Sequence, residues 1–194
     1  KPAKFKKEFP AAISVFDRWA KEGKDKGMEK GHKSSVDFMF RQIKRYFNKP
    51  FTALDIGCGN GWVVRKFNQQ KNCFQSAGVD GAEKMIERAK TADSRGLYIC
   101  EDILDWEPSK RFDVIFSMEV LYYLENPKEF IKKTFNDWLA HEGCFIFGID
   151  HYLENKKSID WPKRVGVNMN TQSIKFWINA MEKAGFKNIK FWQT

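Results

Sequence analysis

The ten residues 53–62, Ala-Leu-Asp-Ile-Gly-Cys-Gly-Asn-Gly-Trp, constrain the fold of this chain more than any other stretch. An apolar run that ends on an acid passes into Gly57, Gly59 and Gly61, and an apolar run resumes at Trp62. Glycine lets a backbone turn sharply and lets a ligand approach without a Cβ in the way. The third glycine of a G-x-G-x-x-G dinucleotide loop would fall on Trp62, so the G-x-G-x-G spacing argues against a nicotinamide or flavin fingerprint.

With Leu54-Asp55 before it, this loop resembles motif I of the class I S-adenosylmethionine-dependent methyltransferases. The resemblance implies S-adenosylmethionine as the cofactor and S-adenosylhomocysteine as its product. It also implies that the loop holds the methionine end of the cofactor against backbone, while Asp55 shapes the loop through hydrogen bonds. The residues assigned to the cofactor on this basis are Asp55, Gly57, Cys58, Gly59, Asn60 and Gly61.

A second short strand is predicted from Ser76 to Asp80, and it ends in an acid about twenty residues after the loop. In such a βαβ unit, a carboxylate at the tip of the second strand can accept both hydroxyls of a ribose. The alternative is that Asp80 only caps the helix predicted over 83–90. We expect ribose binding, because the strand, the acid and the helix follow in the family's order. Gly81 and Met85 are assigned to the same cofactor site.

Two further strands end near residues that the resemblance assigns to the cofactor. After the strand predicted over Leu97–Cys100, Asp102 and Ile103 resemble the family's adenine-edge segment. There an acidic side chain takes the exocyclic amine and a following backbone N–H meets a ring nitrogen. The apolar run 112–117 is typical of a strand buried on both faces. The segment after it, which begins with Met118, resembles motif IV of small-molecule methyltransferases, and Met118 is counted in the cofactor site.

Strands that alternate with helices predict an α/β fold, a doubly wound and mostly parallel Rossmann-like sheet with helices on both faces. Asn126-Pro127 is predicted to begin a helix that ends at Gly143, followed by a fifth strand over Cys144–Ile149. Phe186–Trp192 is expected as a sixth strand. The family pattern inserts a seventh, antiparallel strand between the fifth and the sixth. We expect this strand to be missing, or to come from elsewhere.

At 194 residues the chain is expected to form a single methyltransferase domain. Its expected parts are an N-terminal helical arm or lid (1–48), a cofactor-binding core (50–150), a substrate-side link (151–170) and a terminal helix and strand (171–194). Within the arm, helices are predicted from Ala11 to Glu22 and from Ser34 onward, joined by a Gly- and Lys-rich link. Many methyltransferases fold such a segment over the cofactor, which makes three residues lid candidates: Phe16, Trp19 and His32.

The link after the fifth strand is long for a compact domain, and it leaves the carboxyl end of a strand, where open α/β sheets bind ligands. We interpret it as the far wall of a substrate pocket, with Tyr152 and Tyr123 as wall residues. If the acceptor must lose a proton, His151 or Glu119 is the expected base, with Tyr122 beside them; an ordinary histidine pKa is about 6.5. The alternative for His151 is a hydrogen bond to a loop and nothing more.

The amino-acid composition limits the kinds of partner that we expect this chain to bind. The net charge is +9, and residues 1–33 hold ten Lys and Arg against five Asp and Glu. A basic arm attracts nucleic acid, but no aromatic-interleaved basic motif accompanies the charge.

The four cysteines form no C-x-x-C pair and none lies at metal spacing from a histidine, so no metal is expected. No apolar stretch reaches the length of a membrane span. We therefore expect a cytoplasmic monomer or homodimer that does not act at a membrane.

The leading function is transfer of a methyl group to O, N or S of a small-molecule acceptor by in-line displacement. One alternative is a tRNA- or protein-modifying methyltransferase that uses the basic arm. The segment after the fourth strand lacks the Asn/Asp-Pro-Pro run of amino-methylating nucleic-acid enzymes, which moves weight toward small metabolites. A second alternative is a non-catalytic cofactor-binding subunit.

Overall fold

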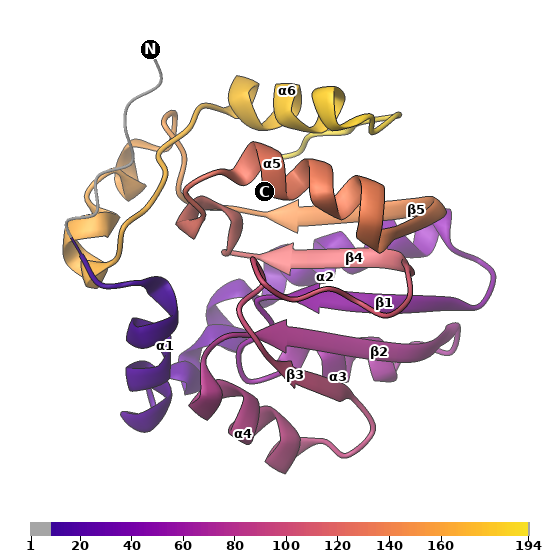
Figure 1. Cartoon of the computed structure of the whole chain (residues 1–194), viewed down its shortest axis with the longest axis horizontal. Coiled ribbons are helices and arrows are strands. Elements are labelled where there is room, and N and C mark those ends of the chain that lie inside the picture. The colour runs from indigo at the N-terminus through magenta and orange to yellow at the C-terminus, as the bar shows by residue number, and fades with distance from the viewer. Residues whose placement is uncertain (1–8, 194) are drawn as a thin grey trace.

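The protein is described here by a computed structural model, which describes residues 9–193 (Figure 1). Its centre is a five-stranded sheet in the order β3-β2-β1-β4-β5. All four strand pairings are parallel, which confirms the expected doubly wound α/β fold. The strands are β1 (Phe51–Ile56), β2 (Cys73–Asp80), β3 (Leu97–Cys100), β4 (Phe112–Met118) and β5 (Leu139–Gly148).

Six α-helices and several short helical turns surround the sheet. The α-helices are α1 (Ala12–Lys21), α2 (Met28–Tyr46), α3 (Trp62–Asn68), α4 (Glu83–Ala92), α5 (Pro127–Lys133) and α6 (Ile174–Ala184). The helix α6 has local signals at both ends. The Ser173 hydroxyl accepts from the Phe176 N–H, and Gly185 follows in the left-handed region at φ 109°.

The core has two layers, one on each face of the sheet. All six residues of β1 are buried, as expected for a central strand that is covered on both sides. On one face, α2 and α3 pack on residues such as Ala53 and Phe116. On the other face, α5 and α6 pack on residues such as Leu54 and Ile115. The two layers together fix where the strands end and therefore where a ligand site can form.

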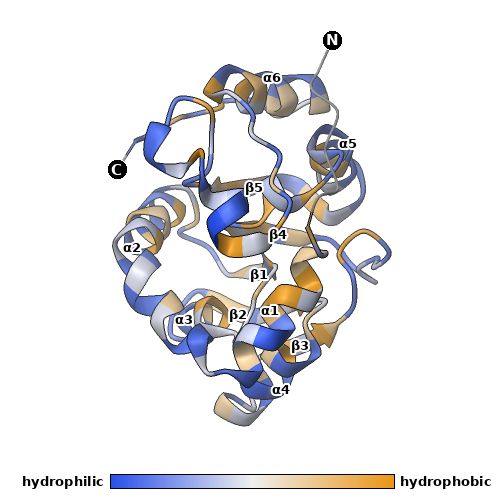
Figure 2. Ribbon diagram, turned by 90° about the vertical axis from the view of Figure 1, so that its left-hand side faces the viewer, coloured by the Kyte–Doolittle hydropathy of each residue, from blue (hydrophilic) through white to orange (hydrophobic). Residues whose placement is uncertain are grey.

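The first helix of the N-terminal arm, α1, lies beyond the carboxyl ends of the strands and is seen in front of the sheet (Figure 2). The second helix of the arm begins earlier than predicted. A short 3-10 turn over Lys24–Gly27 leads directly into α2 at Met28, so the expected start at Ser34 was wrong. Met28 packs against Ala20 and Met85, and this tertiary contact outweighs the low helix propensity of the intervening Gly31.

A buried aspartate that the sequence did not indicate fastens the arm to the sheet. Asp25, which is 2% exposed, accepts from Arg88 of α4 at 2.7 Å and from the amide of Asn60 at 3.2 Å. Nearby, the Asp17 carboxylate accepts from the Lys84 N–H at 2.8 Å. The arm is therefore held on the first turns of α4 and on the glycine loop.

The fifth strand begins before the predicted end of the preceding helix. The helix α5 passes into a wide turn over Thr134–Trp138, and β5 starts at Leu139, so Gly143 does not end a helix. Leu139 pairs with Phe112, whereas Cys144 pairs with Val114, so the residues between them form an irregularity in the strand. Gly143 lies against the Ala140 and Asp113 carbonyls, where a Cβ would leave too little space.

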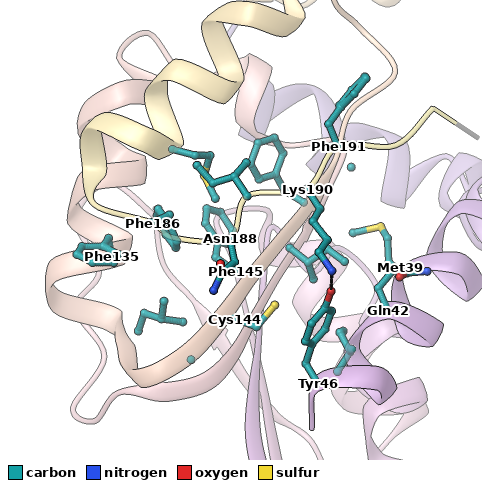
Figure 3. Close-up of a pocket in the computed structure, with 18 of the residues that line it drawn as sticks. Met39, Gln42, Tyr46, Phe135, Cys144, Phe145, Phe186, Asn188, Lys190 and Phe191 are labelled. Atoms are coloured by element: carbon teal, nitrogen blue, oxygen red, sulfur yellow. Dashed lines mark hydrogen bonds between the residues drawn. The ribbon is translucent and has the colours of Figure 1, made fainter.

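The predicted sixth strand is not formed. Residues 186–193 have no regular structure, and within 9–193 no strand pairs with the outer edge of β5. The segment lies beside that edge and bridges to α2, where Lys190 contacts Tyr46 (Figure 3). Between it and β5 runs an apolar groove of about 1190 Å³, with Phe145 and Trp177 in its walls. That the seventh strand is missing or comes from elsewhere stays a prediction.

At the opposite edge of the sheet, a buried carboxylate joins α3, α4 and β3. The Asp93 side chain accepts from the Tyr98 hydroxyl and from the Asn68 amide, each at 3.0 Å, and from the N–H groups of Arg95 and Gly96. Burial acts to raise the pKa of Asp93, but these hydrogen bonds outweigh it and hold the pKa below its ordinary value.

Replacing Tyr98 by Phe removes one of these bonds to a charged acceptor. We expect the free energy of unfolding at pH 7 to fall by about 1–3 kcal/mol. Because the lowered pKa of Asp93 stabilises the fold above the ordinary Asp pKa of about 3.9, the difference from wild type should be constant from pH 5 to 8 and shrink below about pH 4. Urea unfolding at several pH values measures both.

The matched control is Tyr46→Phe, because the Tyr46 side chain is half exposed and its hydroxyl contacts only Lys190. This variant should change the free energy of unfolding by less than about 0.5 kcal/mol. Equal losses in the two variants would show that the Asp93 cluster does not stabilise the fold.

Candidate active site

The carboxyl ends of β1, β2 and β4 open into a cavity of about 840 Å³. Its lining residues come from the glycine loop, from the arm and from the link 151–170. Sixteen of the predicted site residues line this cavity: Phe16, Trp19, His32, Asp55, Gly57, Cys58, Gly59, Asp80, Gly81, Met85, Asp102, Ile103, Met118, Glu119, Tyr122 and Tyr123.

The glycine loop turns through left-handed backbone at its three glycines, Gly57 (φ 68°), Gly59 (φ 51°) and Gly61 (φ 77°). L-residues with a Cβ are strained there. Space is also limiting, because a Cβ on Gly57 would collide with the Val120 side chain and one on Gly61 with the Tyr98 ring. The loop therefore brings bare backbone to the cavity at Gly57 and Gly59.

Asp80 connects the loop to the next helix. One carboxylate oxygen accepts from the Gly59 N–H at 2.9 Å, and the other accepts from the Ala82 N–H at 2.8 Å. Burial raises the pKa of Asp80, and these two hydrogen bonds counteract part of that effect. The N-cap residue of α4 is Ala82 and no side chain caps this helix, so Asp80 does not have the capping role that the sequence left open; its carboxylate lines the cavity.

Asp55 and the segment after β3 complete this half of the cavity. Asp55 is 3% exposed, and burial together with the nearby Asp80 carboxylate raises the pKa of Asp55 well above its ordinary value. The Asp102 side chain accepts from the Leu104 N–H at 2.9 Å, which holds the turn that brings Ile103 into the wall. Along this wall, the Asp102 carboxylate is thus followed by the apolar side chain and the backbone of Ile103.

Four predicted site residues do not line the cavity. Asn60 and Gly61 turn the loop away from it, and Tyr152 lines the groove beside β5 instead. His151 is 0% exposed, and its two ring nitrogens bond to the Ser158 carbonyl at 2.9 Å and the Thr171 hydroxyl at 2.8 Å. Burial lowers the pKa of His151. Its geometry is that of a histidine that fixes the link, which was the alternative interpretation of this residue.

A chain of polar side chains reaches the cavity at the end of β4. The Glu119 carboxyl bonds to the Tyr122 hydroxyl at 2.8 Å and accepts from the Asp150 N–H at 2.6 Å. The Tyr122 hydroxyl in turn bonds to that of Tyr123 at 3.3 Å. Glu119 lies in left-handed backbone at φ 61°, an uncommon conformation for a non-glycine residue that recurs at functional sites.

The arm and the link meet over the cavity. The Phe9 N–H donates to the Asn168 side-chain oxygen at 3.1 Å, and the Asn168 amide donates to the Phe9 carbonyl at 2.7 Å. Below this pair, Phe16 contacts Trp19 and Tyr123 edge to face, with ring centroids 5.3 Å apart in each case. The arm thus contributes aromatic side chains to the cavity wall, and its role as a lid stays a prediction.

Sequence reasoning missed several contributors, namely Asp25, Met28, Trp161, Arg164 and Asn168. No motif marks them, and Asp25 and Asn168 act through contacts between segments distant in sequence. Among residues 9–193, no cluster of three or more His, Cys, Asp or Glu side chains is arranged to hold a metal ion. In the same part of the chain, no helix is long and apolar enough to cross a membrane.

Comparisons with known proteins fit this geometry. Residues 28–190 match the methyltransferase domain family. Malonyl-[acyl-carrier protein] O-methyltransferase of Anoxybacillus flavithermus is 31% identical over 73% of this chain, and the match spans 59% of that relative's length. An uncharacterized protein of Methanocaldococcus jannaschii is 31% identical over 94% of this chain and 85% of its own length.

Among solved structures, the partner of the Trm112 methyltransferase activator in a complex from Haloferax volcanii superposes with a TM-score of 0.78. It is 26% identical, and the match covers 88% of this chain and 75% of that one. Three observations point to the same family: a glycine loop at the end of β1, acids at the tips of the next strands, and a family match over most of the chain. The chain belongs to the methyltransferase domain family, as a class I S-adenosylmethionine-dependent methyltransferase domain.

Proposed function

We propose that this protein transfers the methyl group of S-adenosylmethionine to O, N or S of a small-molecule acceptor. The observation that carries the proposal is one cavity that is lined both by the glycine loop with its acids and by aromatic side chains, several of which come from the arm. These aromatic side chains include Phe16, Tyr123 and Trp161, and Glu119 lines the same cavity. Lid closure by the Phe9–Asn168 pair favours an acceptor small enough to be enclosed.

The residues present fit the cofactor. Gly57 and Gly59 offer backbone without a Cβ to its methionine end, and Asp80 would accept the ribose hydroxyls. Asp102 would accept the adenine amine, with Ile103 against the ring. When bound, the cofactor supplies a methyl group already activated on a sulfonium, so the protein's tasks are alignment and exclusion of water. The lid serves both tasks.

Glu119 is the group we propose as proton acceptor. Its carboxyl lines the cavity, and Tyr122 and the Asp150 N–H orient it. A base has to lie within hydrogen-bond reach of the proton that it takes. His151 does not line the cavity and has both nitrogens engaged, so we do not assign it this role.

A second candidate acceptor is a macromolecule, either a tRNA or a protein. The observation that favours it is the 26% identity to the partner of the Trm112 activator. Under this alternative, the exposed lysines of the arm would lead the acceptor to the cavity mouth, and an activator protein would take part. Monomer or homodimer assembly and a cytoplasmic location remain proposals as well.

Cofactor binding is tested by calorimetric titration with S-adenosylmethionine on wild type and Asp80→Asn. The asparagine keeps an oxygen for a backbone N–H but loses the charge that a ribose hydroxyl would meet. We expect the Kd to rise about 10- to 100-fold, since a hydrogen bond to a charged group contributes about 1.5–3 kcal/mol.

The matched control is Asp137→Asn, an exposed residue of the turn after α5 that does not line the cavity. It should bind as wild type does. Absence of binding by folded wild type, or equal Kd values for Asp80→Asn and wild type, would contradict the proposed cofactor site.

The acceptor class is tested by measuring tRNA binding by fluorescence anisotropy at 50 and 200 mM salt. If the acceptor is a small molecule, bulk tRNA should bind weakly or not at all at 200 mM, because only phosphate contacts would hold it. The variant Lys26→Gln/Lys30→Gln removes two exposed charges of the arm. Tight binding at 200 mM salt that this variant abolishes would favour the macromolecular acceptor instead.

A further inference from the structure

Glu119 is held in one place by contacts on both of its oxygens. It directly follows β4, and its left-handed backbone and its bonds to Tyr122 and the Asp150 N–H fix the carboxyl at the cavity wall. Met118 and Val120, its chain neighbours, also line the cavity. The position is therefore set by the fold and not by a mobile side chain.

The charges around this carboxyl are mostly negative. Within 9–193, no lysine or arginine forms an ion pair with Glu119. Arg164, on the link side of the cavity, is largely exposed and lies 3.8 Å from Asp160. The titratable groups that face the same cavity or contact Glu119 are Asp55 from β1, Cys58 of the glycine loop, Asp80 from β2, Asp102 after β3, Tyr122 and Tyr123, Glu125, Asp150 after β5, His32 from α2 and Arg164.

These surroundings disfavour a charge on Glu119 when no cation is near. Burial, with the Asp150 carboxylate next in size, raises the pKa of Glu119 to about 8, although the Tyr122 hydroxyl and the Asp150 N–H act to lower it. At pH 7 about nine-tenths of the molecules then carry the proton. The cavity thus holds a neutral acid at the place where a cationic cofactor would bring positive charge.

We propose that binding of S-adenosylmethionine expels the proton from Glu119, whereas binding of S-adenosylhomocysteine leaves it in place. The inference rests on the proposed function of this site. A positive sulfonium in the cavity favours the carboxylate by direct attraction, and the neutral thioether of the product does not. Cofactor binding thereby converts Glu119 from an acid into a base.

The charges and protons balance over one turnover. The proton that Glu119 loses on cofactor binding goes to solvent. In the transfer, a bond forms between the methyl carbon and the acceptor atom, the carbon–sulfur bond breaks with its electron pair left on sulfur, and the acceptor's proton passes to Glu119. The cavity then holds a neutral thioether and a neutral acid in place of a cation and an anion. Its net charge is the same before and after the reaction.

The experiment is calorimetric titration at pH 7 in buffers of different ionisation enthalpy, which counts protons released on binding. Wild type should release nearly one proton more with S-adenosylmethionine than with S-adenosylhomocysteine. The two ligands share their amino acid and nucleoside groups, so this difference reports the sulfonium. From pH 6 to 8, affinity for S-adenosylmethionine should rise by up to about tenfold per pH unit and then level off, while affinity for S-adenosylhomocysteine stays flat.

Two variants test whether the released proton comes from Glu119. Glu119→Gln should remove the difference in proton release and the pH slope. Asp150→Asn keeps the backbone N–H that bonds Glu119 but removes the neighbouring charge, so Glu119 should already be partly ionised and the release should fall. A thermal melt of each variant establishes that it is folded, and Asp150→Asn keeps the test decisive if Glu119→Gln does not fold.

Equal proton release with the two ligands in wild type would overturn the proposal, as would an undiminished difference in a folded Glu119→Gln variant. Failure of the proposed function has a different signature, because then neither ligand would bind. The two failures are therefore distinguishable in one set of titrations.

Discussion

The two hydrogen bonds that the Asp80 carboxylate accepts hold the candidate active site together. They join the Gly59 N–H to the Ala82 N–H, and so they join the glycine loop after β1 to the start of α4. The arm rests on the same two elements through Asp25, which bonds to Asn60 and Arg88. Loop, helix and arm thus share one set of buried carboxylates, and the position of each depends on the other two.

Burial of carboxylates has a second effect in this site. Burial raises the pKa values of Asp55, Asp80 and Glu119 above the ordinary range, and a neighbouring acid adds to this effect for Asp55 and Glu119. Such an arrangement is unfavourable by itself and becomes favourable when a cation enters. The cavity is therefore matched in charge to a cationic cofactor before any ligand contact is considered.

The sequence could predict the parallel sheet and many of the residues that gather at the carboxyl ends of its strands, because those depend on local patterns. Strands that end in Asp55, Asp80 and the Asp102 segment were placed correctly, and parallel pairing brings their ends together whatever the loops do. It could not predict contacts such as Phe9–Asn168, whose partners lie 159 residues apart. The direction in which His151 points is likewise decided by the packing of the link.

The predicted helix and strand boundaries were wrong where tertiary contacts outweighed local sequence signals. The second helix starts at Met28 because that side chain fills an apolar gap beside Ala20. Gly143 is a typical end for a helix but here lies inside the irregular part of β5. The run 186–192 has the composition of a strand, yet it lies across a groove from β5 with no strand beside it to pair with. Strand propensity alone does not form a strand.

The Phe9–Asn168 pair also bears on how fast this protein can work. Both of its hydrogen bonds join the arm to the link at residues that line the cavity, so separation of the arm from the link would widen the cavity. Two such bonds contribute together about 1–3 kcal/mol, so losing both would shift the balance toward the separated state by a factor of roughly 5 to 150. Lid motions of this kind take microseconds to milliseconds. Product residence time would thus depend on this pair as well as on the contacts within the cavity.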